Sequence, residues 1–401
     1  MAEVTYSSWF DRIGKSVGGV LVGIVLFFGS FAFLYWNEGS LDLSKYAKTA
    51  VDVKADITAE GADGKLVDIS GKVDSDETLG DDLFLLPGKY LTYNRTAQVY
   101  AWVEEKETTT RKDAVGGGET TTTTYKYKKE WVSRATRSED FNQREVQDWE
   151  SRYSVRIDNS RAEKQNFESK SDRVSSVRMG KYTMSTSGLS LPGQSILSPL
   201  DDTTVKMKDI GGFKPGIEGS TIYLRKNGSS SDNVGDERLT YSVLKSGFDG
   251  TAFGKLAGSE LQSYTVKGQG GDALKHKGVL FHIFAGDKDQ AVATLHSEYS
   301  MMLWIFRIIG FLAMWIGAML VLDPLSTVLD IVGVIGSVSR FLINAILFVI
   351  TLVLSFVTIV IGAIAHNVIV LVIVLAVIIG VIFFLVMQKK NSAGGASGAL
   401  K

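Results

Sequence analysis

Histidine is the residue type in this sequence with the widest range of possible chemistry, and the chain has four: His276, His282, His296 and His366. A neutral imidazole can bind zinc, and it can act as a general base beside a serine or a carboxylate. His276 and His282 are six residues apart, a spacing that no zinc motif requires. One interpretation is a metal site built from these histidines and an aspartate. The preferred interpretation is solvated or hydrogen-bonded histidines.

An enzyme is the minority interpretation. A hydrolase would use His282 or His296 with a neighbouring acid, and it predicts that both histidines lie with carboxylates or a serine in one cleft. The chain has no cysteine, which excludes thiol catalysis and disulfides. It also has no Gly-x-Ser-x-Gly, Walker or His-Glu-x-x-His motif. We therefore predict a protein that is not an enzyme, with no catalytic, cofactor-binding or metal-binding residues.

A run without charge dominates the C-terminal part of the sequence, because no side chain from Phe341 to Met387 is formally charged. One helix of this length would reach about 70 Å, whereas the hydrocarbon core of a bilayer is about 30 Å thick. The run must therefore form two spans that turn at His366-Asn367. With two further apolar segments, the sequence predicts four transmembrane helices, at 17–36, 301–322, 341–365 and 368–387.

Basic residues beside these segments predict the orientation. Arg12 and Lys15 precede the first segment, Arg340 precedes the third, and Lys389-Lys390 follow the fourth. Four crossings place all of them on one side, which the positive-inside rule assigns to the cytoplasm. The expected order is a cytoplasmic N-terminus (1–16), an extracytoplasmic, periplasmic or lumenal domain (37–300), a cytoplasmic amphipathic helix that begins at Asp323-Pro324 (323–340), and a flexible cytoplasmic tail (388–401).

Small and hydroxyl side chains recur on single faces of the first three predicted spans. The main interpretation is helix–helix packing. The alternative is a polar pathway through the membrane, which would need an intramembrane carboxylate or lysine that the 341–387 run lacks. The predicted packing residues are Gly19, Gly23, Ser30, Gly310, Ala313, Gly317, Asn344, Thr351, Ser355, Thr358 and Gly362.

The central segment 37–300 reads as a soluble domain with no evident internal boundary. Threonine-rich segments at 96–109 and 120–136 flank three glycines at 116–118, which predicts a long exposed β-hairpin. The charged stretch 138–176 suits one or two helices, and short strands are predicted at 64–73, 182–184, 222–225, 239–243 and 279–284. The expected fold is a multi-pass α-helical membrane protein, with four transmembrane helices and a large β-rich α+β domain between the first two.

The order of these parts resembles the transmembrane protein 43 (LUMA) family. The first span with its Asn37-Glu38-Gly39 exit is similar to the family's first span, and GKLVDISG at 64–71 and YAWVEE at 100–105 look like its first strands. Further similar segments are the Tyr-rich strand at 125–131 with Phe141-Asn142, the Val-Gly-Asp strand start at 234–236, and the stretch from His296 to Gly317. The threonine-rich hairpin and the stretch 149–173 match least. The absence of cysteine and the Val/Ile/Leu/Phe-rich run fit a bacterial member.

The resemblance implies a non-enzymatic scaffold that organises protein complexes in the membrane. We expect the spans to form a homo-oligomer through their small-residue faces, and the extracytoplasmic domain to bind other membrane proteins or to sense the envelope. The alternative is a module that binds or partitions membrane lipids at the membrane surface. A slight acidic excess in 37–300 argues against nucleic acid as a partner. The expected location is a bacterial inner membrane with a periplasmic domain, or the endoplasmic reticulum or inner nuclear membrane in a eukaryote.

Overall fold

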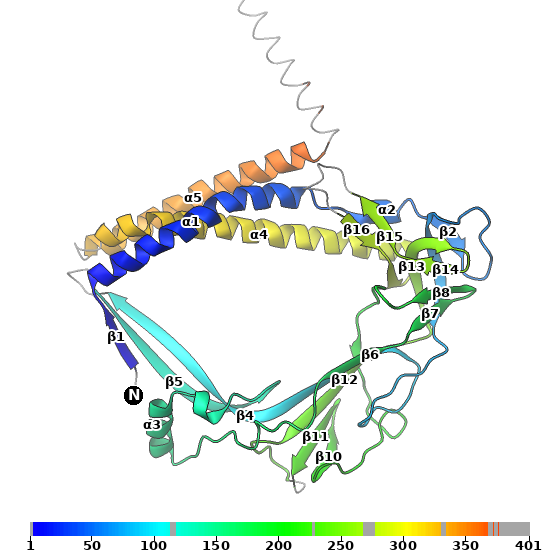
Figure 1. The fold of residues 1–401 in the computed structure, drawn as a ribbon, viewed down its shortest axis with the longest axis horizontal. Helices are drawn as coiled ribbons and strands as arrows, with labels where there is room; N and C mark the ends of the chain where they lie inside the picture. Colours follow the sequence, from blue (N-terminus) through cyan, green and yellow to red (C-terminus); the bar gives the residue numbers. More distant parts are fainter. Residues whose placement is uncertain are drawn as a thin grey trace, which may run out of the picture.

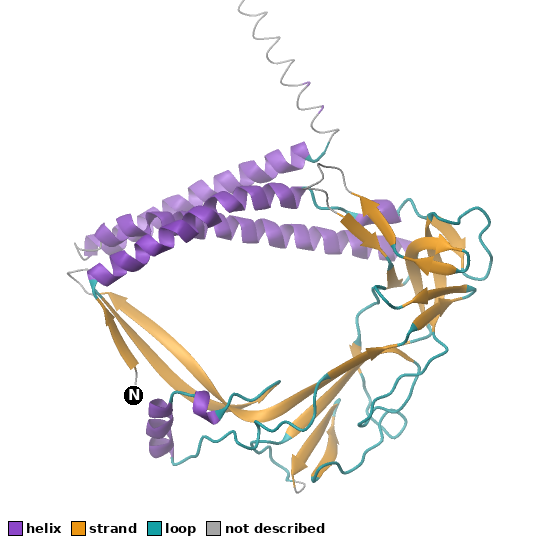
Figure 2. Cartoon of the chain, in the orientation of Figure 1, coloured by secondary structure: helices purple, strands orange, loops and turns teal. Residues whose placement is uncertain are grey.

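Three long helices and a β-rich domain make up the part of the chain that the structure describes, which is residues 3–112, 118–226, 229–267, 277–329 and 334–367 with Val372 and Ala376. In this computed structural model the helices lie side by side in one layer, and the domain extends from one end of that layer (Figure 1). Colouring by secondary structure separates the helical layer from the strands of the domain, and a long β-hairpin reaches back from the domain toward the other end of the layer (Figure 2).

The three helices correspond to the first three predicted spans. They are α1 (Trp9–Glu38), α4 (Lys288–Leu329) and α5 (Val334–Ala365). Each is long and apolar enough to cross a membrane, and their outer faces expose large apolar side chains such as Leu21 and Phe341, both 72% exposed. Such surfaces are stable in hydrocarbon and not in water. The fourth predicted span, 368–387, lies outside the described residues apart from Val372 and Ala376.

α4 is longer at both ends than the predicted span 301–322. It begins at Lys288 in the domain and continues through Asp323 and Pro324 to Leu329, whereas the sequence predicts a new amphipathic helix at Asp323-Pro324. Proline removes one helical hydrogen bond but holds a helical φ. Packing maintains the helix here, because Leu320, one turn earlier, lies against Gly19 of α1. Residues 330–333 lie outside the described part of the chain.

The larger sheet has the strand order β1-β5-β4-β12-β11-β10, with β6 paired to β4 and β9 paired to β12. Its two longest strands form the predicted hairpin, in antiparallel register from Val99↔Val132 to Lys112↔Glu119. The strands are β1 (Glu3–Ser7), β4 (Tyr90–Lys112), β5 (Glu119–Val132), β6 (Lys170–Arg173), β9 (Ser195–Ile196), β10 (Phe213–Glu218), β11 (Thr221–Lys226) and β12 (Glu237–Lys245).

The second sheet has the order β17-β13-β14-β8-β7-β3-β2, and β13 also pairs with β3. A separate hairpin joins β15 to β16. The strands are β2 (Val51–Lys54), β3 (Leu66–Asp74), β7 (Ser176–Met179), β8 (Tyr182–Ser185), β13 (Phe248–Ala257), β14 (Glu260–Gln262), β15 (Tyr264–Lys267), β16 (Lys277–Leu280) and β17 (His282–Ala285). The chain alternates between the two sheets, which explains why the sequence shows no internal boundary.

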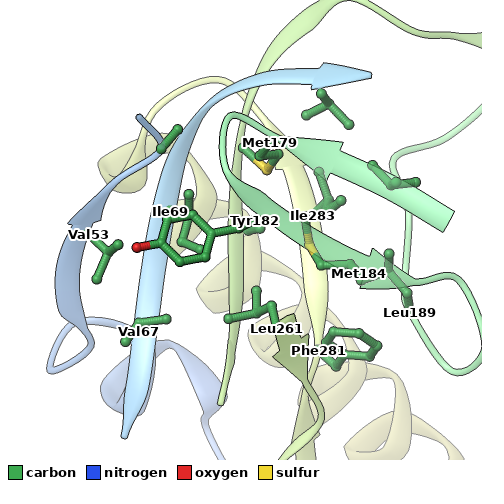
Figure 3. Close-up of a cluster of buried hydrophobic side chains, with 14 of the residues drawn as sticks. Val53, Val67, Ile69, Met179, Tyr182, Met184, Leu189, Leu261, Phe281 and Ile283 are labelled. Atoms are coloured by element: carbon green, nitrogen blue, oxygen red, sulfur yellow. The ribbon is translucent and has the colours of Figure 1, made fainter. Parts of the chain in front are cut away.

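Each sheet has its own hydrophobic core. Figure 3 shows the core of the second sheet, where Ile69 of β3, Tyr182 of β8 and Ile283 of β17 point toward one another. Alternation along β3 places Val67, Ile69 and Val73 in this core, as the pattern at 64–73 predicts. The larger sheet buries Leu239 and Tyr241 of β12 in a second core.

Short helices complete the domain. α2 (Leu43–Ala47) follows α1, and α3 (Gln143–Tyr153) follows a 3₁₀ turn at Ser138–Asp140, in the stretch where one or two helices are predicted. α3 packs on the β4–β5 hairpin, because Val146 shares a buried cluster with Trp102 and Tyr127. The hairpin is therefore held to the body of the domain at its base.

The N-terminal strand β1 is not predicted by the sequence. It pairs with β5 in antiparallel register from Glu3↔Thr123 to Ser7↔Glu119, and the hydroxyl of Tyr125 donates a hydrogen bond to Glu3 Oε2 at 2.9 Å. Five residues with only two apolar side chains are too short to predict as a strand. The ladder exists because β5 supplies an open edge at the end of the hairpin.

Candidate functional site at the junction of helices and domain

Small residues bring α1 and α4 into close contact. A Cβ built on Gly23 would lie 2.8 Å from the carbonyl oxygen of Gly317, and one on Gly310 would lie 2.4 Å from Leu34. Gly19 faces Leu320, a Cβ on Gly317 would lie 2.6 Å from the backbone nitrogen of Phe27, and Ala313 is half-buried on the same helix. Close backbone approach of this kind is how membrane helices associate. Here it joins two helices of one chain.

The polar stripe of α5 faces the other helices. Thr351 and Ser355 are buried, and the hydroxyls of Thr351, Ser355 and Thr358 donate to carbonyl groups one turn earlier in α5. Ser30 of α1 is satisfied in the same way by Phe27. Asn344 lines a cavity of about 170 Å³ beside Asp323 and Leu320. These hydroxyls are already paired within their own helices and do not form a chain of donors across the layer.

A buried ion pair joins α1 to α4 at the end of the helical layer where the chain passes from α1 into the domain. Arg307 of α4 donates to Glu38 from Nε to Oε1 at 2.8 Å and from Nη2 to Oε2 at 2.6 Å. The guanidinium carbon also lies 4.8 Å from the ring centroid of Trp304. Charged side chains are costly in hydrocarbon unless they are paired, so a bidentate carboxylate and an aromatic face stabilise this arginine at the start of the apolar part of α4.

The residues on either side of Glu38 complete the junction. The side-chain amide of Asn37 donates to the carbonyl of Leu303 at 3.2 Å, which joins α1 to α4. A Cβ on Gly39 would lie 2.8 Å from the imidazole of His366, and one on Gly362 would lie 2.9 Å from Glu38. Each residue of the Asn-Glu-Gly exit thus has a distinct packing role.

A second ion pair joins α4 to the second sheet. Lys288 Nζ lies 2.6 Å from Oδ1 of Asp68, which is 1% exposed, and it donates to the carbonyl of Ala50 at 3.0 Å. Burial of the Asp68 carboxyl has the largest influence on its pKa, and the nearby ammonium of Lys288 offsets part of that influence. Burial accordingly raises the pKa of Asp68.

An amphipathic pocket lies beside this junction. It has a volume of about 270 Å³, and α4 forms one wall of it with Leu295, Tyr299 and Met302. His282 of β17 forms part of another wall and stacks on Phe284, with ring centroids 5.7 Å apart. Burial lowers the pKa of His282, so the neutral imidazole is favoured. The other lining residues are Ser40, Leu41, Leu43, Glu298, Leu303 and Phe306.

The structure does not bring the three histidines that it describes into one cleft. His296 is 60% exposed and lies 3.4 Å from Asp42, which also caps α2 through Ser44, whereas His282 lines the pocket. His366 accepts or donates a hydrogen bond with the carbonyl of Gly362. His276 lies outside the described residues. Among the residues that the structure describes, no group of His, Asp or Glu could hold a metal ion.

Other buried charges belong to the fold. Asp81 accepts hydrogen bonds from Arg95 and Tyr241, both at 2.6 Å, and from three backbone N–H groups that follow it. Glu237 accepts from the backbone N–H groups of Asn166 and Phe167, and burial raises its pKa. Carboxylates with this many donors fix loops and do not need a ligand.

Sequence reasoning missed the ion pairs Glu38–Arg307 and Asp68–Lys288. One signal was present for the first: an arginine inside an apolar span requires a partner, and Glu38 is a carboxylate at the edge of the adjacent span. The sequence around Asp68 gives no comparable indication of the Asp68–Lys288 pair. Asp68 occupies a polar position in the strand pattern, and α4, which covers that face, is more than 200 residues away.

This arrangement, in which an apolar helical layer is joined to a large β-rich domain, is that of an integral membrane protein. The family model of transmembrane protein 43 matches residues 99–368, so the chain belongs to the transmembrane protein 43 family. The chain is 25% identical over 309 residues to the Drosophila melanogaster transmembrane protein 43 homolog, covering 74% of each chain. It is 24% identical over 349 residues to transmembrane protein 43 of Homo sapiens, covering 80% of this chain and 78% of the human protein. No solved structure matches the chain.

Proposed function

We propose that this protein is a non-enzymatic scaffold that organises protein complexes in the membrane. The observation that carries the proposal is the continuity of α4. Its first residues, Ala291, Val292 and Leu295, are buried against the domain in one cluster with Phe253 and Phe284, and the same helix continues into the apolar layer. A partner bound to the domain would therefore be held in a fixed relation to the bilayer.

A half-exposed face of the larger sheet suits partner binding. We define the Trp131 face as Tyr100, Trp131, Tyr223, Arg225 and Arg238. The ring centroid of Trp131 lies 5.2 Å from that of Tyr100 and 5.6 Å from that of Tyr223, with Arg238 stacked 4.7 Å above it. Tryptophan, tyrosine and arginine dominate the energetics of protein interfaces. We propose that other membrane proteins bind here.

Location and self-association are parts of the same proposal. Lys389-Lys390 after the last apolar segment favour a cytoplasmic C-terminus, so we propose a bacterial inner membrane with the domain on the periplasmic face. The glycines of α1 and α4 pack against each other within the chain. A homo-oligomer would therefore form through the exposed side of α5, where Val349 and Phe356 lie.

The test is a comparison of captured partners. Crosslinked native membranes would be used to purify the wild type, Arg238→Glu and a control, Arg156→Glu, whose side chain is 84% exposed elsewhere on the domain. The scaffold proposal expects a defined set of membrane proteins with the wild type and the control, and loss of that set with Arg238→Glu at unchanged thermal stability. Equal recovery of the same proteins by all three forms contradicts binding at the Trp131 face.

Lipid binding is the second candidate, and the pocket beside α4 favours it. Its lining combines apolar side chains with the polar groups of Glu298, Tyr299 and His282, which matches the two chemistries of a phospholipid. Met302→Trp should fill the pocket, while Ile308→Trp, at a position 54% exposed on the same helix, is the matched control. Phospholipid retained per protein after mild detergent, measured by mass spectrometry, should fall in the first variant only. Equal retention in both contradicts this candidate.

A further inference from the structure

The pocket beside α4 lies at the level where that helix passes from water into hydrocarbon. Residues 288–300 of α4 include several charged side chains, whereas Arg307 is the only charged residue in 301–322. The α4 residues that line the pocket extend from Leu295 to Phe306, which is about 17 Å along the helix axis. The pocket therefore lies across the membrane–water boundary, where the head group of a phospholipid meets its acyl chains.

An exposed apolar face of α4 continues from the pocket. Met302, Ile305 and Ile309 are 41–47% exposed, and their spacing of three and four residues places them on one side of the helix. Trp304 in the same stretch is 61% exposed, as is common for tryptophan at a membrane interface. The pocket has a volume of about 270 Å³, less than that of sites that enclose a whole small molecule. It can therefore hold a lipid head group while the acyl chains lie along this face.

His282 supplies this pocket with a hydrogen-bond donor that carries no charge. The backbone N–H of Phe281 donates to Nδ1 of His282 at 3.1 Å, so Nδ1 is unprotonated and the neutral ring carries its proton on Nε2. Burial, which lowers the pKa of His282, favours the same neutral form. Nε2 has no hydrogen-bond partner among the described residues. The imidazole can therefore donate to a phosphate or ester oxygen without neutralising a negative charge.

The charge of the pocket comes from Glu298. This carboxylate lines the pocket and forms no ion pair with a residue that the structure describes. No lysine or arginine is among the described residues that line the pocket. Arg307, which follows the last of them, already donates two hydrogen bonds to Glu38. A ligand here meets an uncompensated negative charge, which attracts a cationic group and repels an anionic one.

We infer that this pocket selects a zwitterionic phospholipid whose head group carries an ammonium, as an ethanolamine phospholipid does. The inference rests on the lipid-binding candidate above and adds the class of lipid. The ammonium pairs with the carboxylate of Glu298, and the phosphate oxygens accept hydrogen bonds from His282 Nε2 and from the hydroxyl of Tyr299. A phospholipid with a net negative head group is disfavoured, because it would add a second negative charge beside Glu298 with no cation between them.

The test measures the class of the retained lipid separately from its amount. The wild type, Glu298→Gln and a control, Glu139→Gln, whose side chain is 71% exposed elsewhere on the domain, would be reconstituted in vesicles of equal parts phosphatidylethanolamine and phosphatidylglycerol. Each form would then be extracted in mild detergent, and the retained lipids counted by mass spectrometry. We expect about fivefold more phosphatidylethanolamine than phosphatidylglycerol on the wild type and the control, and a ratio near that of the vesicles on Glu298→Gln.

Met302→Trp, which fills the pocket, separates two different failures. If this variant retains as much lipid as the wild type, the pocket holds no lipid, and the lipid-binding candidate fails together with the inference. If it retains less, but the wild type holds the two lipids in the ratio of the vesicles or with more phosphatidylglycerol, the pocket binds lipid and the inferred class is overturned. An excess of phosphatidylethanolamine that persists in Glu298→Gln also overturns the inference, because selection would not depend on that carboxylate.

Discussion

Glu38 and Arg307 are 269 residues apart in the sequence and form a bidentate ion pair. The carboxylate side chain is 3% exposed and the guanidinium side chain 18%. Nearly the whole β-rich domain lies between these two residues along the chain, so the pair ties the segment that enters the domain to the segment that leaves it. The pair connects the domain's two chain ends where both meet the apolar layer.

Removing one partner of this ion pair should lower the free energy of unfolding more than removing both partners. Glu38→Ala leaves the buried guanidinium without its carboxylate, and loss of one partner of a buried pair costs about 3–5 kcal/mol. The double variant Glu38→Ala, Arg307→Met removes both charges and should recover most of that loss. Thermal unfolding in mild detergent measures both. A double variant less stable than the single one would show that the pair is not the source of the effect.

Gly23 should tolerate no side chain, because its Cβ would meet the carbonyl of Gly317 and the side chain of Leu320 at 2.8 Å. Gly23→Leu should separate α1 from α4 and destabilise the protein by about 1–3 kcal/mol. A Cβ on Gly29 of the same helix would have nothing within 4 Å, so Gly29→Leu is a control of equal size. Equal melting temperatures for the two variants would contradict the observed packing of α1 on α4.

His282 should make the protein sensitive to mild acid. Burial lowers its pKa below the ordinary value of 6.5, so the unfolded chain binds the proton more readily than the folded one. The stability from neutral His282 is present above pH 6.5 and is lost as the pH falls below it. Between about pH 7.5 and about pH 5.5, His282→Gln should lose less stability than the wild type. Denaturant titrations of the two forms at both pH values measure this difference, and equal losses of stability would contradict it.

Arg95 should be essential to the fold of the larger sheet. It pairs with Asp81, whose side chain is fully buried, so Arg95→Met leaves a buried carboxylate without its cation and should cost about 3 kcal/mol or more. Arg137 pairs with Asp140 at the surface, where both side chains are at least 47% exposed, and Arg137→Met should change the free energy of unfolding far less than Arg95→Met does. Comparable losses on chemical denaturation would refute the structural role of Arg95.

Much of the fold follows from local sequence. Alternation at 64–73 predicts β3, and threonine-rich arms predict β4 and β5, because period-two patterns reflect a single buried face. The first three apolar segments match α1, α4 and α5 because length and apolarity alone specify such helices. The family resemblance is confirmed by the family match over 99–368.

Long-range pairing could not be predicted in the same way. Asp68 looks like a solvent-facing residue of β3, and only the distant Lys288 makes its burial tolerable. The extent of α4 through Pro324 depends on contacts with α1 that lie outside the local sequence. The ladder between β1 and β5 depends on an edge that forms only when the hairpin has folded. Each of these features is set by tertiary contacts, which a local pattern does not contain.

The alternation of the chain between the two sheets limits what can be cut from this protein. β3 and β13, which pair in the second sheet, are separated in sequence by the strands β4 to β12, most of which belong to the larger sheet. No single cut point leaves one sheet with all of its strands and none of the other's, so neither sheet can be expressed as a contiguous fragment. A truncation anywhere between Leu66 and Glu237 removes strands from both sheets at once.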